Sequence, residues 1–278
     1  MNVGYEIWAV RCGRIPDFPV SGIHASAHNG GILDLPFGFL VCRNRDRIVL
    51  IDCGFDIGGS SRSYAETAGV VESRSAVQAL ASLGVEPGRV TDVILTHLHW
   101  DHAGGLAAFS EATVHLQERE LSEWRRLLAG PPSHAFLVEA IDPNDVAQVS
   151  ELSARAVVRF HHGETIGALP GVDLIDATDT HTPGSQCVAI LDNVCKTWVA
   201  AGDCVMSAEN LTGLVPGVYS PISGVHGSRE RLFDLYDRIV STVDGDLSRV
   251  IAVHDARTWT DHPTLAGSND MIAALAVR

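Results

Sequence analysis

The chain has 278 residues, which is enough for one large domain or two small ones with a full hydrophobic core. Its formal net charge of −14 at pH 7 argues against a nucleic-acid partner, because binding to phosphates requires a basic surface. No apolar run approaches the ~20 residues that span a bilayer, and residues 1–6 lack a basic stretch followed by an apolar one. We therefore expect no membrane segment and no secretion signal.

Strand-like patterns dominate the first hundred residues. Ser73 is a candidate N-cap for a helix that continues to Leu83, with Gly84 as its stop signal. A hairpin turn is expected at 44–46. Strands are predicted at 5–11, 37–43, 48–52 and 93–95.

Four candidate metal ligands follow the strand at 93–95 directly. They are His97, His99, Asp101 and His102, in the sequence THLHWDHAGG of residues 96–105. Imidazole nitrogens and carboxylate oxygens are ligands of zinc and similar divalent ions, and such crowding favours more than one ion. In a tight loop, His97 and His99 can face one ion while Asp101 and His102 face a second.

The rest of the chain alternates short strands with helices. A helix is expected to begin within 103–109, directly after the histidine cluster. Further strands are predicted at 113–117, 172–176, 188–192, 196–201 and 250–253. Further helices are predicted at 118–128, 228–241 and 271–276. These elements suggest two related halves around one site, and we predict a single domain over residues 1–278.

Three more candidate ligands each follow an apolar run. His181 follows the strand at 172–176, Asp203 follows 197–202, and His254 follows 250–253. In layered α/β folds the active-site groups gather where strands end. We therefore expect these three side chains to complete the site begun by the histidine cluster.

With these motifs the chain resembles the metallo-β-lactamase superfamily, whose signature is His-x-His-x-Asp-His followed by a distant His, Asp and His. Within that superfamily it is similar to the N-acyl-homoserine lactonases. The resemblance runs from LDLP at 33–36, through IVLIDCG at 48–54, to VHD at 253–255. It implies an α/β fold, the four-layer αβ/βα sandwich of two mixed sheets flanked by helices.

The resemblance also implies two divalent metal ions per chain. Zinc comes first among the candidates, and iron, manganese and cobalt suit the same ligands. Asp203 would bridge the two ions. The first ion would be bound by His97, His99 and His181, and the second by Asp101, His102 and His254.

Two positions depart from the family pattern. Residues 178–180 are Thr-Asp-Thr, where the superfamily usually has Thr-Pro-Gly. Met206 stands where the lactonases carry a tyrosine that is thought to contact the substrate carbonyl. A thioether is a poor hydrogen-bond donor, so either another group polarises the carbonyl or the metal does so alone. Tyr219 and His226 are candidates for that other group.

Three loops are candidates for the substrate pocket: residues 55–61, 130–136 and 211–227. The second is a candidate lid that ends at Phe136. Side chains that flank the motifs in sequence predict an apolar wall, formed by Trp100, Phe136, Met206 and Leu211.

The ligand set implies a mechanism in which a hydroxide that bridges both metals attacks a carbonyl carbon. Asp101 and Asp203 would orient this nucleophile, and one of them would pass its proton to the leaving alkoxide. Asp52 is a candidate partner that fixes one of the ligand histidines, and it is equally a turn-forming aspartate.

We therefore expect a hydrolase that opens a lactone, either an N-acyl-homoserine lactone or a related small lactone. The alternative is hydrolysis of a cyclic amide, a thioester or a phosphotriester at the same dinuclear site. A diiron redox protein on this fold is disfavoured by histidine at positions 102 and 181 and by the absence of a flavin domain.

The six cysteines form no Cys-x-x-Cys pair and lie in apolar stretches, which is typical of buried thiols in a reducing compartment. We expect a cytoplasmic monomer or homodimer that acts on a small-molecule substrate.

Overall fold

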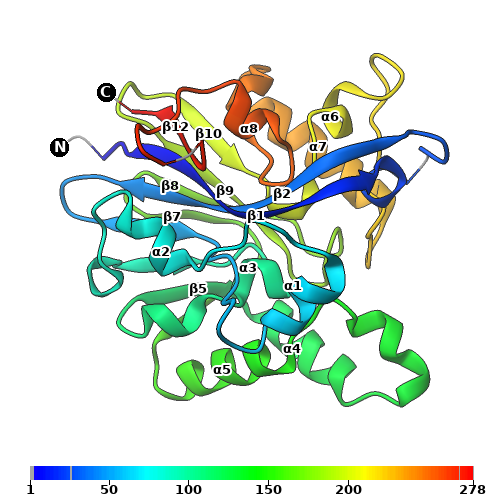
Figure 1. Ribbon diagram of the computed structural model, residues 1–278, viewed down its shortest axis with the longest axis horizontal. Coiled ribbons are helices and arrows are strands. Elements are labelled where there is room, and N and C mark those ends of the chain that lie inside the picture. The colour runs from blue at the N-terminus through cyan, green and yellow to red at the C-terminus, as the bar shows by residue number, and fades with distance from the viewer. Residues whose placement is uncertain (1–2, 26, 269, 278) are drawn as a thin grey trace.

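The structure, a computed structural model, describes residues 3–25, 27–268 and 270–277. Two β-sheets pack face to face, and helices cover their outer surfaces (Figure 1). Met1 and Asn2, part of the stretch examined for a secretion signal, lie outside the described residues.

The larger sheet is mixed. Its strands are β1 (Glu6–Pro19), β2 (Ile32–Arg43), β3 (Ile48–Ile51), β4 (Asp92–Ile94), β5 (Thr113–Gln117), β6 (Val158–His161) and β12 (Ile272–Ala276). They lie in the order β12-β1-β2-β3-β4-β5-β6. Pairing is antiparallel from β12 to β3 and parallel from β3 to β6.

The smaller sheet is also mixed. Its strands are β7 (Thr165–Leu169), β8 (Val172–Asp176), β9 (Gln186–Leu191), β10 (Thr197–Ala200) and β11 (Val250–Ile251). They lie in the order β11-β10-β9-β8-β7, and only the β10–β11 pair among them is parallel.

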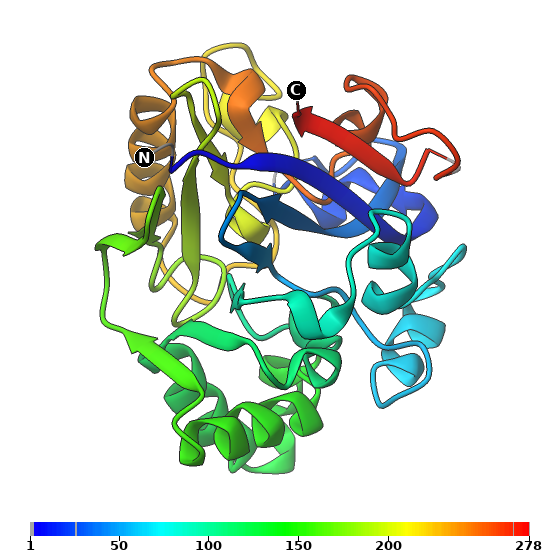
Figure 2. The ribbon, with the colours of Figure 1, turned by 90° about the vertical axis from the view of Figure 1, so that its left-hand side faces the viewer.

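The helices are α1 (Arg62–Ala68), α2 (Ala76–Ala81), α3 (Trp100–Ala103), α4 (Glu118–Leu128), α5 (Pro143–Ala154), α6 (Glu209–Thr212), α7 (Arg229–Thr242) and α8 (Arg257–Thr260). Of these, α2, α4 and α5 pack on the outer face of the larger sheet, and α7 packs on that of the smaller sheet. In Figure 2, α7 (orange) runs along the smaller sheet, while α4 and α5 (green) lie at the opposite side of the molecule. Within the described ranges, no helix has the length and apolar character needed to cross a bilayer.

Alternating side chains divide the core into three layers. Ile7 of β1 and Val188 of β9 pack together between the two sheets. Their neighbours point the other way: Trp8 packs among residues of α2, α4 and α5, and Cys187 packs against α7. This period of two buries both faces of each sheet. The predicted αβ/βα sandwich is thereby confirmed.

Several predicted elements match the structure closely. The elements at 113–117, 118–128 and 172–176 have the predicted bounds. The predicted helix at 228–241 is α7, whose N-cap Ser228 accepts hydrogen bonds from two backbone N–H groups. The turn after β2 is also confirmed, because Asn44 Oδ1 accepts hydrogen bonds from the backbone of the next turn residues.

The helix predicted at 271–276 is wrong. This segment is β12, which pairs antiparallel with β1, and Ile272 and Ala273 are fully buried there. Intrinsic helix propensities differ by only tenths of a kcal/mol per residue. A strand ladder along β1 and burial of the apolar side chains therefore outweigh them.

Other boundaries also shift. The helix predicted from Ser73 is shorter, because Ser75 is the N-cap and forms a capping box with Gln78. The helix expected within 103–109 is a 3₁₀ segment, Leu106–Phe109. Five cysteines are buried as expected, but Cys195 is exposed in the turn between β9 and β10.

Candidate metal centre

The candidate ligands emerge at one edge of the sandwich. β4 of the larger sheet leads into the loop that carries the histidine cluster. In the smaller sheet, β8 and β10 both pair antiparallel with β9, so they run in the same direction, and β11 is parallel to β10. His181, Asp203 and His254 follow the carboxyl ends of these three strands. Both sheets therefore contribute side chains to one site.

The structure brings all seven candidate ligands together in two groups, each with its ligand atoms within 4.8 Å of one another. One group is His97, His99, His181 and Asp203, and the other is Asp101, His102 and His254. All seven side chains are buried.

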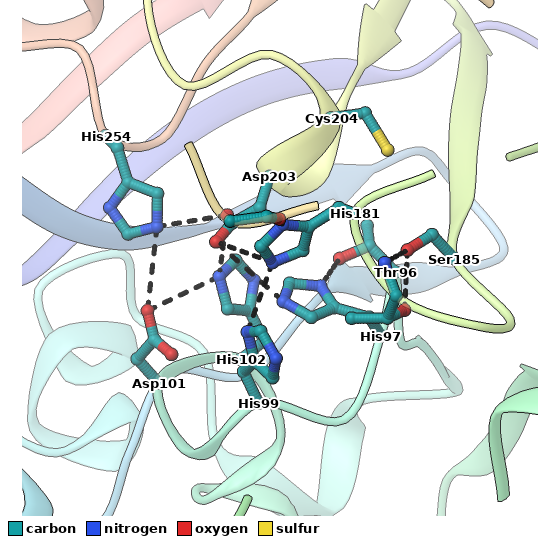
Figure 3. A network of polar contacts seen from close by, with 12 residues as sticks. Thr96, His97, His99, Asp101, His102, His181, Ser185, Asp203, Cys204 and His254 are labelled. Carbon is teal, nitrogen blue, oxygen red and sulfur yellow. Dashed lines mark hydrogen bonds and ion pairs between the residues drawn. The ribbon is translucent and has the colours of Figure 1, made fainter. Parts of the chain in front are cut away.

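Asp203, in the 3₁₀ segment η5 (Gly202–Cys204), lies between the two groups (Figure 3). Its Oδ1 is 3.0 Å from the Nε2 atoms of both His102 and His254. Its Oδ2 is 3.4 Å from His181 Nε2 and 3.8 Å from His97 Nε2. One carboxylate thus presents an oxygen to each group.

Backbone carbonyls orient two of the histidines. His181 Nδ1 donates to Gly224 O at 2.7 Å, and His254 Nδ1 donates to Pro36 O at 2.7 Å. A proton on Nδ1 leaves the Nε2 lone pair free, and in both rings Nε2 faces the centre of the site.

Asp52 orients two more. Its Oδ2 lies 2.8 Å from His102 Nδ1 and accepts a hydrogen bond from the Thr96 hydroxyl, also at 2.8 Å. The Thr96 hydroxyl oxygen in turn lies 3.0 Å from His97 Nδ1. Asp52 therefore contacts a ligand histidine, His102, as its position in the sequence suggested. Thr96 links the same carboxylate to a second ligand histidine, His97.

Four buried polar atoms in the centre form no hydrogen bond of acceptable geometry with the described residues, although three of them lie within 3.0 Å of a neighbouring ligand atom. They are Asp203 Oδ1 and the Nε2 atoms of His97, His102 and His254. A buried unsatisfied polar atom costs about 1–3 kcal/mol. Divalent cations coordinated by these atoms would remove that cost, so the donor set fits the metals that the fold implies.

Burial and charge divide the histidines into two kinds. Burial lowers the pKa of His97 well below its usual value, and it lowers the pKa of His99 to about 3 with help from His181. Burial acts to lower the pKa of His102 and His254 too, but the carboxylates of Asp203 and Asp101 together, with that of Asp52 beside His102, outweigh burial and raise the pKa of both. A metal ion at the second group would therefore compete with protons for these nitrogens.

A cavity of about 350 Å³ opens beside His99 and His181. Phe136, 77% exposed on the 3₁₀ segment η4 (Pro132–Val138), lies on its rim together with His226. The rest of the lining is Trp124, Leu137, Glu139, Ala140, Ser223, Gly224 and Val225. The structure thus brings two of the four candidate substrate residues to this cavity.

The other two candidate substrate residues lie elsewhere. Met206 packs against the cluster of Phe37 and Trp100, and the Phe37 ring lies 5.2 Å from that of His254. Tyr219 donates its hydroxyl hydrogen to Asp237 and does not line the cavity. Proximity in sequence placed Tyr219 near the site, whereas the chain folds its ring back onto α7.

Sequence reasoning missed Glu120, which is fully buried and accepts hydrogen bonds from two loops of the site. A signal was present, because Glu120, Leu121 and Trp124 share the buried stripe of α4. The carbonyls of Pro36 and Gly224 could not be found from sequence, because every residue has a carbonyl group.

Comparisons with known proteins agree with this architecture. The family model of the metallo-β-lactamase superfamily matches residues 33–253. An N-acyl homoserine lactonase from a Bacillus species is 26% identical over 205 residues, 70% of this chain and 74% of the relative. The acyl-coenzyme A thioesterase MBLAC2 from Bos taurus is 27% identical over 257 residues, 85% of this chain and 82% of the relative.

Solved structures share the fold. An N-acyl homoserine lactone hydrolase, with the product N-hexanoyl-L-homoserine at its catalytic metal centre, superposes with a TM-score of 0.69 at 20% identity, covering 95% of this chain and 98% of its own. The dizinc quorum-quenching lactonase AidC superposes with a TM-score of 0.67 at 14% identity, covering 92% of each chain. Because the family model spans most of the sequence, the chain belongs to the metallo-β-lactamase superfamily and is a hydrolase.

Proposed function

We propose that this protein is a metal-dependent hydrolase that opens a neutral lactone with an apolar substituent, either an N-acyl-homoserine lactone or a related small lactone. The observation that carries the proposal is the cavity beside His99 and His181, whose lining includes a cluster of apolar side chains and contains no lysine or arginine.

Two divalent ions, with zinc as the first candidate, would occupy the two ligand groups. One would be held by His97, His99 and His181, the other by Asp101, His102 and His254, with Asp203 shared. Such ions supply Lewis acidity at a substrate carbonyl and a nucleophile derived from water at neutral pH.

The protein's own carboxylates transfer the proton of the attacking water. Asp101 Oδ2 lies 3.4 Å from His102 Nε2 and 3.6 Å from His254 Nε2, so it borders the same space as Asp203. A carboxylate oxygen in this position accepts a proton from the attacking water and returns it to the leaving alkoxide. The ring-opened product is a hydroxy acid.

The charges around the site favour a neutral substrate. Among the residues that line the cavity, Glu139 is the one carboxylate, and none is a lysine or arginine. A second groove, beside His254, contains Arg257, but this guanidinium is paired with Glu209 and Asp255 at 2.6 Å each. Apart from the metal ions themselves, neither groove offers an unpaired lysine or arginine to a phosphate or carboxylate group.

The apolar lining favours an acyl or aryl substituent. Trp124, Phe136, Leu137 and Val225 all line the cavity. Each methylene group that a substrate buries there contributes about 0.8 kcal/mol of binding free energy. A small uncharged lactone ring with an acyl chain matches the apolar side chains of this cavity and its lack of lysine and arginine.

A thioesterase is the second candidate, because the MBLAC2 relative matches a larger share of this chain than the lactonase does. The two functions need similar attack on an acyl carbonyl, but coenzyme A carries several phosphates. The Glu139 carboxylate would repel these phosphates, and no lysine or arginine in the cavity lining compensates for it.

A substrate panel that separates bond type from charge tests the proposal. The substrates are an acyl-homoserine lactone, the thioester of the same acyl group with coenzyme A, its thioester with uncharged N-acetylcysteamine, and a neutral phosphotriester. We expect kcat/KM for the lactone to exceed that for the coenzyme A thioester by about 100-fold or more, since about 2.7 kcal/mol corresponds to that ratio. Preference for the coenzyme A thioester would contradict the proposal, and preference for the uncharged thioester would contradict the lactone assignment alone.

A further inference from the structure

Glu120 is a fully buried carboxylate of α4 with four hydrogen bonds. Its Oε1 accepts from Leu98 N at 2.9 Å and from Trp124 Nε1 at 2.7 Å. Its Oε2 accepts from the Thr182 hydroxyl at 2.8 Å and from Gly184 N at 2.7 Å. All four donors lie in, or next to, parts of the candidate site.

Three of these bonds reach the two loops that carry the ligand histidines. Leu98 is the residue between His97 and His99, and the turn Thr182–Gly184 directly follows His181. One carboxylate therefore connects the loops that carry the three histidines of the first ligand group.

The fourth bond reaches the substrate cavity. The Trp124 ring lies 5.9 Å from the His99 ring and 5.1 Å from the His226 ring, between centroids, and it lines the cavity. Its indole nitrogen is fixed by the same Glu120 oxygen that binds the Leu98 peptide. The position of this wall is thereby coupled to the position of the histidine loop.

Stability alone gives a weak reason for a carboxylate here. Among the described residues, no lysine or arginine forms a salt bridge with Glu120, so its desolvation is offset by neutral donors only. Close packing also holds the turn, because a Cβ at Gly184 would lie 2.2 Å from the backbone nitrogen of Glu120.

We propose that Glu120 is a positioning residue: it sets the spacing between the His97–His99 loop and His181, and ties that spacing to the cavity wall at Trp124. The inference rests on the metal assignment of the proposed function. Partners of this kind typically change metal affinity or activity by 10–100-fold when removed.

The test measures zinc affinity without substrate. Metal-free protein is titrated with Zn²⁺ in competition with a chelator, for wild type and for Glu120→Gln, which replaces an acceptor oxygen by an NH₂ group facing N–H and O–H donors. We expect one of the two bound Zn²⁺ ions to bind about 10–100-fold more weakly, and the other to be unchanged. Equal affinities in both proteins would overturn the inference.

Asp192→Asn is the matched control. Asp192 is also buried and accepts from two backbone N–H groups, those of Val194 and Lys196, and from Trp198 Nε1, yet it lies in the turn between β9 and β10. We expect this variant to lose stability without losing Zn²⁺ affinity. A comparable loss of Zn²⁺ affinity in Asp192→Asn would show that the effect is general destabilisation.

A second pair of variants keeps the test decisive if Glu120→Gln does not fold. Thr182→Val removes one hydrogen bond to Glu120, whereas Thr182→Ser retains the hydroxyl. We expect weaker Zn²⁺ binding in the valine variant and recovery in the serine variant; equal binding in the two would overturn the inference.

If wild type binds Zn²⁺ but opens no lactone, the proposed substrate fails while this result stands, whereas a wild type that binds no Zn²⁺ overturns both.

Discussion

At the scale of single residues, Asp203 is the side chain on which the centre most depends. Its two oxygens face different ligand groups, so no other residue of the site can replace it. We expect Asp203→Asn to lower kcat at least about 1,000-fold, because losing a shared ligand removes about 4 kcal/mol of transition-state stabilisation. Steady-state kinetics and metal content measure this. Asp173→Asn, in β8 away from both groups, is the control, and near-normal turnover by Asp203→Asn would refute its bridging role.

The residues of the site were predictable from sequence to different degrees. The seven candidate ligands were found because histidine and aspartate are chemically distinctive at strand ends, and the fold brings all seven together. Glu120 escaped notice because it lies on a helix outside the motifs. Tyr219 was misplaced because sequence distance does not report which way a long loop folds.

Asp145 is a buried carboxyl group outside the centre. It is 3% exposed, and its Oδ2 has no hydrogen-bond partner among the described residues. Burial, and then the nearby carboxylate of Asp142, raise the pKa of Asp145 from 3.8 to about 7. The folded state therefore keeps a proton that the unfolded chain releases above about pH 4, so the free energy of unfolding falls as pH rises towards about 7.

Asp145→Asn tests this assignment. The amide imitates the protonated carboxyl group at every pH, so we expect the variant to be more stable than wild type at pH 8, on the order of 1–3 kcal/mol. Near pH 4 the two proteins should be similar. Urea unfolding at both pH values gives the comparison, and a stability difference that does not change with pH would show that Asp145 titrates normally.

At the scale of elements, η4 shapes the substrate cavity. It holds Phe136 at the rim, where the ring is 77% exposed and free to cover a bound acyl chain. We expect Phe136→Ala to raise KM for long-chain lactones with kcat nearly unchanged, because this contact serves ground state and transition state alike. The increase should grow with chain length, by up to about 0.8 kcal/mol per methylene that loses its contact.

Kinetics with lactones that differ only in acyl length measure the effect. Val215→Ala is the control, because Val215 is 64% exposed and does not line the cavity. The same rise in KM for short and long chains would place the acyl group elsewhere.

Helices and strands were predicted well where the capping residues and the hydrophobic pattern of a segment favour the same structure as its tertiary packing. Helix α7 has a serine cap and an amphipathic pattern, and both survive in the structure. β12 shows the opposite case, because its alanines favour a helix locally while β1 offers a strand edge that no local pattern reveals. The order of strands in the two sheets was likewise beyond local patterns, and the family resemblance implied only the four-layer sandwich of two mixed sheets.

At the scale of the whole molecule, the candidate ligands connect the two sheets. The histidine cluster follows β4 of the larger sheet, and the remaining three ligands follow strands of the smaller one. Bound ions would therefore cross-link the halves of the sandwich, and the metal-free protein would instead leave buried polar atoms unsatisfied at that junction.

This arrangement predicts that metal controls the stability of the entire fold. A ligand that binds only the folded state stabilises it by about 2.7 kcal/mol at a concentration 100 times its dissociation constant. We therefore expect the Tm of chelator-treated protein to rise with Zn²⁺ concentration, and saturated protein to contain two ions per chain. Scanning calorimetry and metal analysis measure both quantities. Asp203→Asn should lose most of the rise in Tm, because an amide has one oxygen and no negative charge, so the two groups no longer share a carboxylate. A Tm that does not depend on Zn²⁺, or a single ion at saturation, would contradict a dinuclear centre that joins the two sheets.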